Sequence, residues 1–323
     1  MIRYTIYIAL LFVSLASCDN LPKDVPTESL SLQLSSSEVS LIVLGNVQDA
    51  GSPHMGCKKS CCSTLFEKRD NDRMVVSLGL VDPTNKKQYI FEASPDFHLQ
   101  AKYLKELSGL PQELPDGIFL THAHIGHYTG LMYLGKEAIN ADLVPVYAMP
   151  RMKSFLETNG PWSQLVSLKN IDIKVLSDRK EQPITSNFKV VPFRVPHRDE
   201  YSETVGYKII GPKKSALFIP DIDKWEKWED DIIKELDSVD FAFLDATFYD
   251  AKEINYRDIS QIPHPFAIES MEKFSNLSTI DKKKIYFIHL NHTNPLLDKS
   301  SEASKMVIDK GFNVARKGMT FTL

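Results

Sequence analysis

The sequence predicts an α/β (α+β) fold in which two β-sheets are covered by helices on the outside. Short apolar runs bounded by turn residues occur in groups along the chain, with helical patterns between them, which is typical of layered sheets and helices. The 323 residues are 43% hydrophobic and 25% charged, which is enough to bury a sizeable core. Because no low-complexity linker interrupts residues 40–323, we expect one domain there.

In the first half of the chain, apolar runs that end at Gly, Pro or Asn predict strands. The runs 74–81 and 88–91 lie on either side of Pro83-Thr84-Asn85 and therefore predict a hairpin. A helix is predicted over 97–107, and Pro150 opens another at the first helical position, where proline is tolerated. The strands predicted in this half are 39–44, 74–81, 88–91, 117–120 and 144–148.

The second half repeats the alternation of strands and helices. Two connections, 160–185 and 248–263, are predicted to be loops that determine substrate specificity. The predicted strands are 188–195, 205–210, 216–219, 239–244, 284–290 and 319–322, and the predicted helices are 223–236, 265–274 and 300–309.

The N-terminus carries the pattern of a targeting signal. Arg3 precedes a short apolar run at 6–13, which is too short to span a bilayer comfortably, and Leu15-Ala16-Ser17-Cys18 follows. This pattern resembles the bacterial lipoprotein signal, in which the cysteine is lipidated and becomes the mature N-terminus. The alternative is an ordinary secretory signal with a cysteine there by chance.

The resemblance divides the chain into three parts. Residues 1–18 are the expected signal peptide with its lipobox, and 19–37, rich in serine and proline, form a flexible tether. Residues 38–323 form the folded domain. We therefore expect an exported bacterial lipoprotein that is anchored to the membrane through Cys18, on the periplasmic or cell-surface side.

The charge balance excludes one class of partner. The net charge is −4 and the isoelectric point is near 6.2, whereas a sequence-independent nucleic-acid binder needs a basic surface. We expect a small-molecule substrate and no nucleic acid; the oligomeric state stays open.

A histidine motif follows the apolar run 117–120. His122, His124 and His127 fall within Thr-His-Ala-His-Ile-Gly-His at 121–127, although the whole chain contains only 9 histidines. Neutral imidazole binds Zn²⁺, Fe²⁺ or Mn²⁺, and a short loop at a strand end can direct several rings at one point. The motif therefore predicts a metal site; the alternative is a polar surface loop.

Four more polar residues stand at the ends of apolar runs. Side chains at strand ends can be held rigidly by the sheet while they face a shared cleft, although each alone is commonly a structural residue. The four residues are His197, Asp221, Asp245 and His289.

Taken in order, these motifs resemble the metallo-β-lactamase-fold superfamily over about 40–323. Val43-Leu44-Gly45 with a cysteine-rich loop, Ala93-Ser94-Pro95-Asp96, and 289–295 (His-Leu-Asn-His-Thr-Asn-Pro) are similar to the coenzyme PQQ synthesis protein B family. Val195-Pro196-His197 with Gly206-Tyr207, then Pro220-Asp221, Asp245-Ala246-Thr247-Phe248 and His264, look like the PhnP-type cyclic phosphodiesterases and tRNase Z. The resemblance implies a four-layer αβ/βα sandwich with the site at one edge.

The resemblance also implies a role for each ligand. His122, His124 and His197 would hold a first metal, and His127 and His289 a second, with Asp221 bridging. The family pattern is His-x-His-x-Asp-His, and Gly126 occupies the aspartate position here. A carboxylate of the second site is therefore expected to be absent, which leaves open a mononuclear centre, a centre of iron or manganese, or a loss of hydrolysis.

A hydrolytic mechanism can be written for these residues. Asp221 could hold the attacking water, and His264 matches the histidine of the phosphodiesterase branches that would protonate the leaving oxygen. Asp245 could orient His264. The alternative for His264 is a polar residue at a helix start.

Cys57, Cys61 and Cys62 lie in a loop that contains Gly and Pro. Three thiolates and one histidine would form a closed structural zinc site, and the PhnP-like proteins carry such a site. We expect His292 to be the fourth ligand, with His54 as second choice. Because an exported chain favours disulfides, one disulfide and a free thiol is the alternative.

These features predict a metallohydrolase that cleaves an ester or phosphodiester with one or two zinc ions, manganese or iron being possible, and a further structural zinc. The alternative is an iron-dependent oxidase or hydroxylase resembling the PQQ synthesis protein, because an incomplete second site leaves open positions for O₂ chemistry. A third reading, a binding lipoprotein without catalysis, conflicts with the nearly complete ligand set.

Overall fold

Two sheets of seven strands each form the centre of the computed structural model, which describes residues 37–254 and 262–323. In spatial order, the first sheet consists of β14 (Thr320–Thr322), β1 (Ser40–Gly45), β2 (Ser77–Asp82), β3 (Lys87–Phe91), β4 (Gly117–Phe119), β5 (Val144–Ala148) and β6 (Ile171–Val175). The second consists of β13 (Asn313–Val314), β12 (Ile285–Ile288), β11 (Phe241–Asp245), β10 (Ser215–Ile219), β9 (Val205–Ile210), β8 (Lys189–Arg194) and β7 (Gln182–Pro183).

Both sheets are half antiparallel and half parallel. In the first sheet, β14 to β3 pair antiparallel and β3 to β6 pair parallel. In the second sheet, β7 to β10 pair antiparallel and β10 to β13 pair parallel. Strands β1, β3 and β4 therefore run in one direction, as do β8, β10, β11 and β12, so that the residues after each group of strands emerge at one edge of each sheet.

The core between the sheets holds the histidine loop in place. Phe91 and Phe119 of the first sheet stack with ring centroids 4.6 Å apart, and the ring of Tyr207 from the second sheet packs edge-on against Phe91 at 5.6 Å. The buried Tyr207 hydroxyl donates a hydrogen bond to the carbonyl of Leu120, which precedes the histidine motif. Packing between the sheets thus fixes the end of β4.

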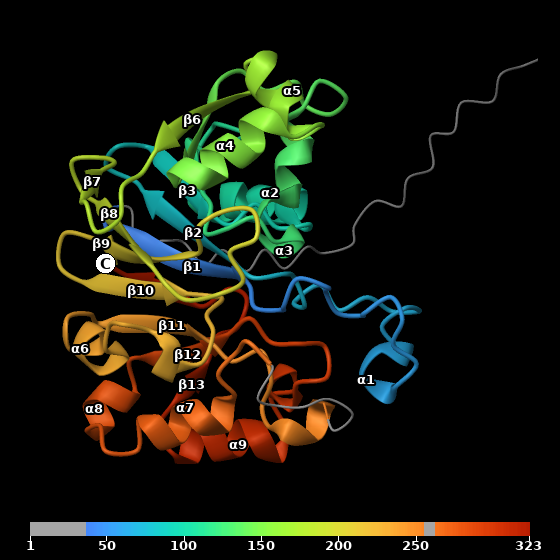
Figure 1. Ribbon diagram of the computed structural model, residues 1–323, viewed down its shortest axis with the longest axis vertical. Helices are drawn as coiled ribbons and strands as arrows, with labels where there is room; N and C mark the ends of the chain where they lie inside the picture. Colours follow the sequence, from blue (N-terminus) through green and yellow to red (C-terminus); the bar gives the residue numbers. More distant parts are fainter. Residues whose placement is uncertain (1–36, 255–261) are drawn as a thin grey trace, which may run out of the picture. The chain divides into compact units, whose positions relative to one another are not determined.

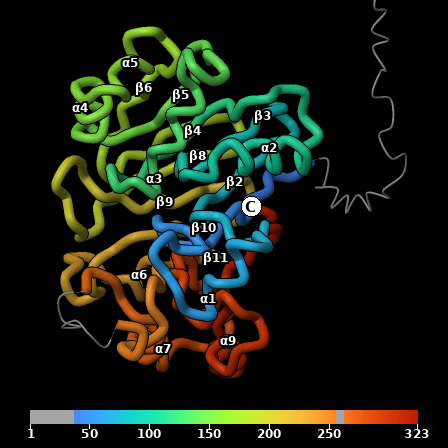
Figure 2. The backbone as a smooth tube through the Cα atoms, turned by 90° about the vertical axis from the view of Figure 1, so that its right-hand side faces the viewer, coloured from blue at the N-terminus to red at the C-terminus, as the bar shows by residue number. Residues whose placement is uncertain are grey.

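Helices cover the outer face of each sheet (Figure 1), and Figure 2 shows the same division from the side. Buried side chains of α2, α4 and α5 pack on the first sheet, and those of α6, α7 and α9 pack on the second. The expected arrangement of two sheets with helices outside is confirmed. The helices are α1 (Ser60–Ser63), α2 (Phe97–Ser108), α3 (Ile125–Tyr128), α4 (Pro150–Thr158), α5 (Trp162–Ser167), α6 (Ile232–Asp237), α7 (Ala267–Lys273), α8 (Thr279–Lys282) and α9 (Glu302–Asp309).

The single helix predicted over 223–236 is wrong. A 3-10 turn at Trp225–Lys227 and the separate helix α6 occupy this segment. Trp228 between them is extended (φ −83°, ψ 129°), and its indole nitrogen donates to the carbonyl of Arg194 at 3.0 Å. Asp231 then begins α6 by accepting a hydrogen bond from the backbone nitrogen of Ile233 at 2.9 Å.

The loop predicted at 160–185 is also wrong in part, because it contains α5, β6 and β7.

The signal peptide and lipobox expected at 1–18, with Cys18, and the tether expected at 19–37 lie outside the described residues except for Ser37. Part of the predicted loop 248–263 lies outside them as well. Within 37–254 and 262–323, none of the helices has the length and apolar character that crossing a bilayer requires.

Candidate active site

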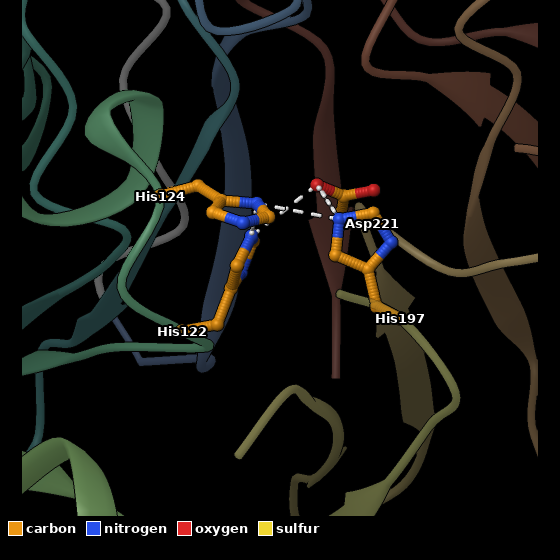
Figure 3. Close-up of side chains that lie close together, drawn as sticks. All are labelled: His122, His124, His197 and Asp221. Atoms are coloured by element: carbon orange, nitrogen blue, oxygen red, sulfur yellow. Dashed lines mark hydrogen bonds and ion pairs between the residues drawn. The ribbon is translucent and has the colours of Figure 1, made fainter. Parts of the chain in front are cut away.

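Four predicted site residues converge at the shared edge of the sheets (Figure 3). We call His122, His124, His197 and Asp221 the first ligand group. His122 Nε2 and His197 Nε2 lie 3.3 and 3.2 Å from Asp221 Oδ2, and His124 Nδ1 lies 2.8 and 3.3 Å from the same two ring nitrogens. The histidines follow β4 and β8, and Asp221 follows β10, so that both sheets contribute to the group.

The spacing of the first ligand group fits a metal ion. Zinc–nitrogen bonds of about 2.0–2.1 Å in a tetrahedron place neighbouring ligand atoms roughly 3.3 Å apart, close to the separations found here. Asp221 is 2% exposed, and its Oδ1 atom accepts no well-directed hydrogen bond from the described residues, although His264 Nδ1 is only 3.2 Å away. A buried carboxylate among imidazoles requires a cation or a shared proton.

A second ligand group lies beside the first and contains a residue that the sequence did not predict. His127, His289 and Asp221 are joined there by Asp49, from the loop between β1 and β2. Asp49 Oδ1 lies 3.0 Å from His127 Nε2 and 3.0 Å from His289 Nε2, and Asp221 Oδ2 lies 3.7 Å from His127 Nε2. The motif carboxylate at position 126 is absent as expected, but Asp49 places another carboxylate beside the same two histidines.

The two ligand groups contain five histidines. In four of them, the ring nitrogen that does not belong to the ligand group has a hydrogen-bond partner of its own. Such partners fix the ring orientation and the tautomer of metal-binding histidines. His197 differs, because its buried Nδ1 atom has no hydrogen-bond partner among the described residues. The pairs are His122 Nδ1 with Thr121 Oγ1 (2.9 Å), His124 Nε2 with Glu200 Oε2 (3.3 Å), His127 Nδ1 with Glu92 Oε2 (2.8 Å) and His289 Nδ1 with Thr247 Oγ1 (2.8 Å).

The electrostatics of the second group favour a cation. Burial raises the pKa of Asp49, but the hydrogen bonds and charges of His127 and His289 outweigh burial and hold that pKa well below its usual value. Burial lowers the pKa of His127, but the Asp49 and Glu92 carboxylates outweigh it and raise that pKa well above the usual value. These opposing shifts show that the carboxylates stabilise positive charge at this point.

His264 lies between two carboxylates. Its Nδ1 atom is 2.8 Å from Asp245 Oδ2 and 3.2 Å from Asp221 Oδ1. Burial lowers the pKa of His264, but Asp245 and Asp221 outweigh burial and raise the pKa to about 10. Asp245 is held in turn by Thr247, whose backbone nitrogen and hydroxyl both donate to Asp245 Oδ1, at 2.9 and 2.7 Å. The structure thus brings together all three predicted catalytic residues.

Cys57, Cys61 and Cys62 form a separate group and carry free thiols. The Sγ atoms of Cys57 and Cys61 are 3.6 Å apart, and those of Cys61 and Cys62 are 3.9 Å apart. Zinc–sulfur bonds of about 2.3 Å in a tetrahedron give sulfur separations of roughly 3.8 Å. The three thiols thus fit three corners of a zinc site.

The fourth ligand expected for that site is less well placed. Neither His292 nor His54 joins the group formed by the cysteines within the described residues. The two imidazoles instead stack on each other with centroids 4.5 Å apart, and both line the cavity that Cys57 also lines. Burial and the neighbouring charges of His54 and Lys59 lower the pKa of His292 to about 4, which keeps the ring neutral and leaves one of its two nitrogens without a proton. His292 as the fourth ligand stays a prediction.

Comparison with known proteins identifies the family. A family model described as Beta-lactamase superfamily domain matches residues 87–290, which is more than half of the chain. The chain belongs to the beta-lactamase superfamily. Coenzyme PQQ synthesis protein B from Methylobacterium sp. (strain 4-46) is 24% identical over 305 residues, which covers 87% of this chain and 99% of that protein.

Two solved structures share the fold. Zinc-bound PqqB from Methylobacterium extorquens has a TM-score of 0.72 and 20% identity, and covers 88% of this chain and 100% of its own. A diphosphatase from the PhnP family has a TM-score of 0.64 and 21% identity, and covers 88% of this chain and 97% of its own. The αβ/βα sandwich of metallo-β-lactamase type and the resemblance to these two branches are confirmed. The fold and the clustered histidines and carboxylates together support a divalent metal.

Two residues of the site were missed from sequence. Asp49 stands four residues after β1, between Gln48 and Ala50, and no recurring motif surrounds it. The fully buried Glu92 directly follows β3 and has a left-handed backbone (φ 78°), which is strained for a glutamate. An acidic residue directly after a strand was a usable signal for Glu92, whereas Asp49 gave none.

Proposed function

We propose that the protein is a metal-dependent hydrolase that cleaves an ester or a phosphodiester. The observation that carries this proposal is the position of His264, whose ring meets Asp245 and Asp221 through one nitrogen. Asp221 is also part of both ligand groups. A proton donor therefore lies directly beside the place where a metal would be held.

The roles of the residues follow from this geometry. Divalent metal bound by the ligand groups would lower the pKa of water toward neutrality and polarise the scissile group. Asp245 accepts the hydrogen bond from His264 Nδ1, and the nearby charge of Asp221 helps to keep the ring protonated, which leaves Nε2 to donate to the leaving oxygen. Asp221 Oδ1, which accepts no well-directed hydrogen bond from described residues, is free to accept one from the attacking water.

The metal we propose is zinc, as one or two ions, with manganese or iron as alternatives. The ligand set of imidazoles and carboxylates suits all three ions. A structural neighbour from the PhnP family is described as a diphosphatase, and this supports hydrolysis at phosphorus for the present chain. The cysteine group with His292 is proposed to bind a further, structural zinc.

A second candidate is iron-dependent oxidation, suggested by the resemblance to coenzyme PQQ synthesis protein B. The curated relative matches almost from end to end, which favours this candidate. However, the open coordination positions were expected because position 126 carries glycine. Asp49 offers a carboxylate at the same group, so fewer positions are left open for O₂. Hydrolysis is therefore the better supported of the two activities.

We also propose a small-molecule substrate outside the cytoplasm, with the domain anchored through lipidated Cys18. The support is the N-terminal sequence pattern and the acidic net charge. Expression of the full chain with and without Cys18→Ser, followed by membrane fractionation and mass spectrometry, tests the anchor. Wild-type protein with an intact Met1 in the soluble cytoplasmic fraction would refute export.

The activity is tested on purified wild-type protein loaded separately with Zn²⁺, Mn²⁺ or Fe²⁺. The substrates are bis-p-nitrophenyl phosphate, p-nitrophenyl phosphonate esters, p-nitrophenyl butyrate and a lactone series, with oxygen uptake measured in parallel. We expect hydrolysis of at least one ester that chelation abolishes and zinc or manganese restores. Oxygen consumption that depends on iron, with no hydrolysis, would overturn the proposal in favour of the oxidase.

A further inference from the structure

Position 126 is crowded, although it carries glycine. A Cβ atom added there would lie 2.5 Å from Asp49 Cγ, 2.5 Å from Asp49 Oδ1 and 2.6 Å from Asp49 Cα, all closer than real Cβ atoms approach. The backbone of Gly126 lies in α3 and has no positive φ, so its conformation does not require glycine. Glycine is needed because Asp49 fills the space.

The carboxylate of Asp49 occupies this space with a defined orientation. Its Oδ1 atom lies 3.0 Å from Nε2 of both His127 and His289, and its side chain is only 13% exposed. His127 Nε2 has Asp221 Oδ2 as its other acidic neighbour, at 3.7 Å. Asp49 therefore presents its oxygen to the two histidines of the second ligand group from the place where a side chain at position 126 would begin.

The backbone beside Asp49 is anchored to both sheets. Val47 forms bridges to Val75, which precedes β2, and to Leu290, which follows β12. Gln48 donates its backbone nitrogen to the carbonyl of Leu290 at 2.9 Å, and its own carbonyl accepts from Gly51 at 2.8 Å to close the turn. The loop thus holds Asp49 by backbone hydrogen bonds and does not depend on a motif around it.

We infer that Asp49 replaces the aspartate that the superfamily motif places at position 126, so that the loop after β1 supplies the carboxylate of a second metal site. The inference rests on the metal-dependent function proposed above and adds a ligand to it. It also makes the two positions mutually exclusive: a carboxylate can be present at 49 or at 126, but not at both.

The test is a double-mutant cycle read by metal binding. Wild type, Asp49→Gly, Gly126→Asp and Asp49→Gly/Gly126→Asp form the cycle, and Asp49→Asn is added as the variant that keeps the side-chain shape. All are stripped with chelator and titrated with Zn²⁺ alone, and bound metal is measured by calorimetry and elemental analysis. Asp72→Asn is the control, because the Asp72 side chain is 74% exposed. Cobalt substitution separates sulfur-bound metal at the cysteines from metal at the histidines by its thiolate absorption bands.

Asp49→Asn should weaken the second histidine-bound equivalent by about 100-fold or more and leave the first in place, since loss of even an outer partner costs about 10–100-fold. Gly126→Asp alone should also lose the second zinc equivalent, because the new side chain collides with Asp49. Asp49→Gly/Gly126→Asp should bind the second equivalent again. The inference would be overturned if the second zinc ion bound Asp49→Asn as tightly as it binds wild type. It would also be overturned if wild type bound no second zinc ion at the histidines.

The outcomes separate this inference from the proposed function. Because Asp49→Asn keeps the shape of the side chain, it gives a decision even where Gly126→Asp does not fold, which circular dichroism detects. Asp49-dependent binding of the second equivalent without ester hydrolysis in wild type would support the ligand and refute the hydrolase. Ester hydrolysis in wild type, together with binding of the second zinc ion that does not depend on Asp49, would support the hydrolase and refute Asp49 as a ligand.

Discussion

Glu92 Oε2 lies 2.8 Å from His127 Nδ1, and both side chains are completely buried. The other oxygen of Glu92 accepts the backbone nitrogen of Thr121 at 3.1 Å. One carboxylate thus connects the start of the histidine motif to the ring of its last histidine. Glu92 is a positioning residue, since it acts on the second ligand group through His127.

Replacing Glu92 with glutamine should lower the affinity of the second ligand group for zinc by about 10–100-fold, the usual cost of losing such a partner. The first equivalent should bind as in wild type, because Glu92 contacts none of its ligands. Competitive zinc titration of Glu92→Gln measures both equivalents. The matched control is Glu226→Gln, whose side chain is 74% exposed. Equal weakening of both equivalents would indicate a general structural role.

His264→Ala should reduce turnover by about 10²–10⁴-fold, the usual contribution of a general acid, while metal content stays near that of wild type. The loss should be greater for esters with poor leaving groups, since these need protonation most. His98→Ala serves as the control, because His98 is an exposed histidine on α2. Unchanged turnover on a poor leaving group would contradict the role of His264 as proton donor.

Removing any histidine of the first ligand group should abolish activity and release the metal held there. His122→Ala, His124→Ala and His197→Ala each leave three of the four residues of the first ligand group. Elemental analysis after gel filtration measures the bound metal, again with His98→Ala as the control. Full metal stoichiometry in His197→Ala would refute the assignment of that residue.

Cys61→Ser should lower the melting temperature and the solubility more than it changes turnover of the folded fraction. A closed sulfur-rich zinc site contributes folding free energy directly, and the cysteines form a group separate from the two ligand groups of the active site. Thermal unfolding with and without chelator tests this, with the exposed Ser63→Ala as the control. Detection of a disulfide between two of the three cysteines in untreated protein would eliminate the structural zinc.

The parts predicted well from sequence are those fixed by periodicity and by position at a strand end. His197, Asp221 and His289 each follow a strong apolar run, and the ends of parallel strands meet at one sheet edge, so their proximity follows from the pattern. The strand 144–148 and the start of α4 at Pro150 have the predicted bounds because turn residues and proline mark them.

The parts predicted poorly depend on contacts between distant segments. Trp225 and Trp228 have helical spacing, but Trp228 leaves the helical conformation to bond to the backbone of Arg194. Asp49 reaches the site because Val47 joins both sheets, which no local pattern reveals. Glycine at position 126 predicts a missing carboxylate, whereas it makes room for the carboxylate of Asp49 from elsewhere in the chain.

The contribution of both sheets to each ligand group has a consequence for how the molecule unfolds. His124 and His197 are 73 residues apart in sequence, and Asp49 and His289 are 240 apart, so an ion bound between them would close very long loops without a covalent bond. Such an ion binds only when the two sheets are assembled, so its binding adds to the free energy of unfolding. Removal of the metal would then weaken the contact between the two sheets. The resistance of the protein to heat and to proteases would therefore rise and fall with the concentration of free metal around it.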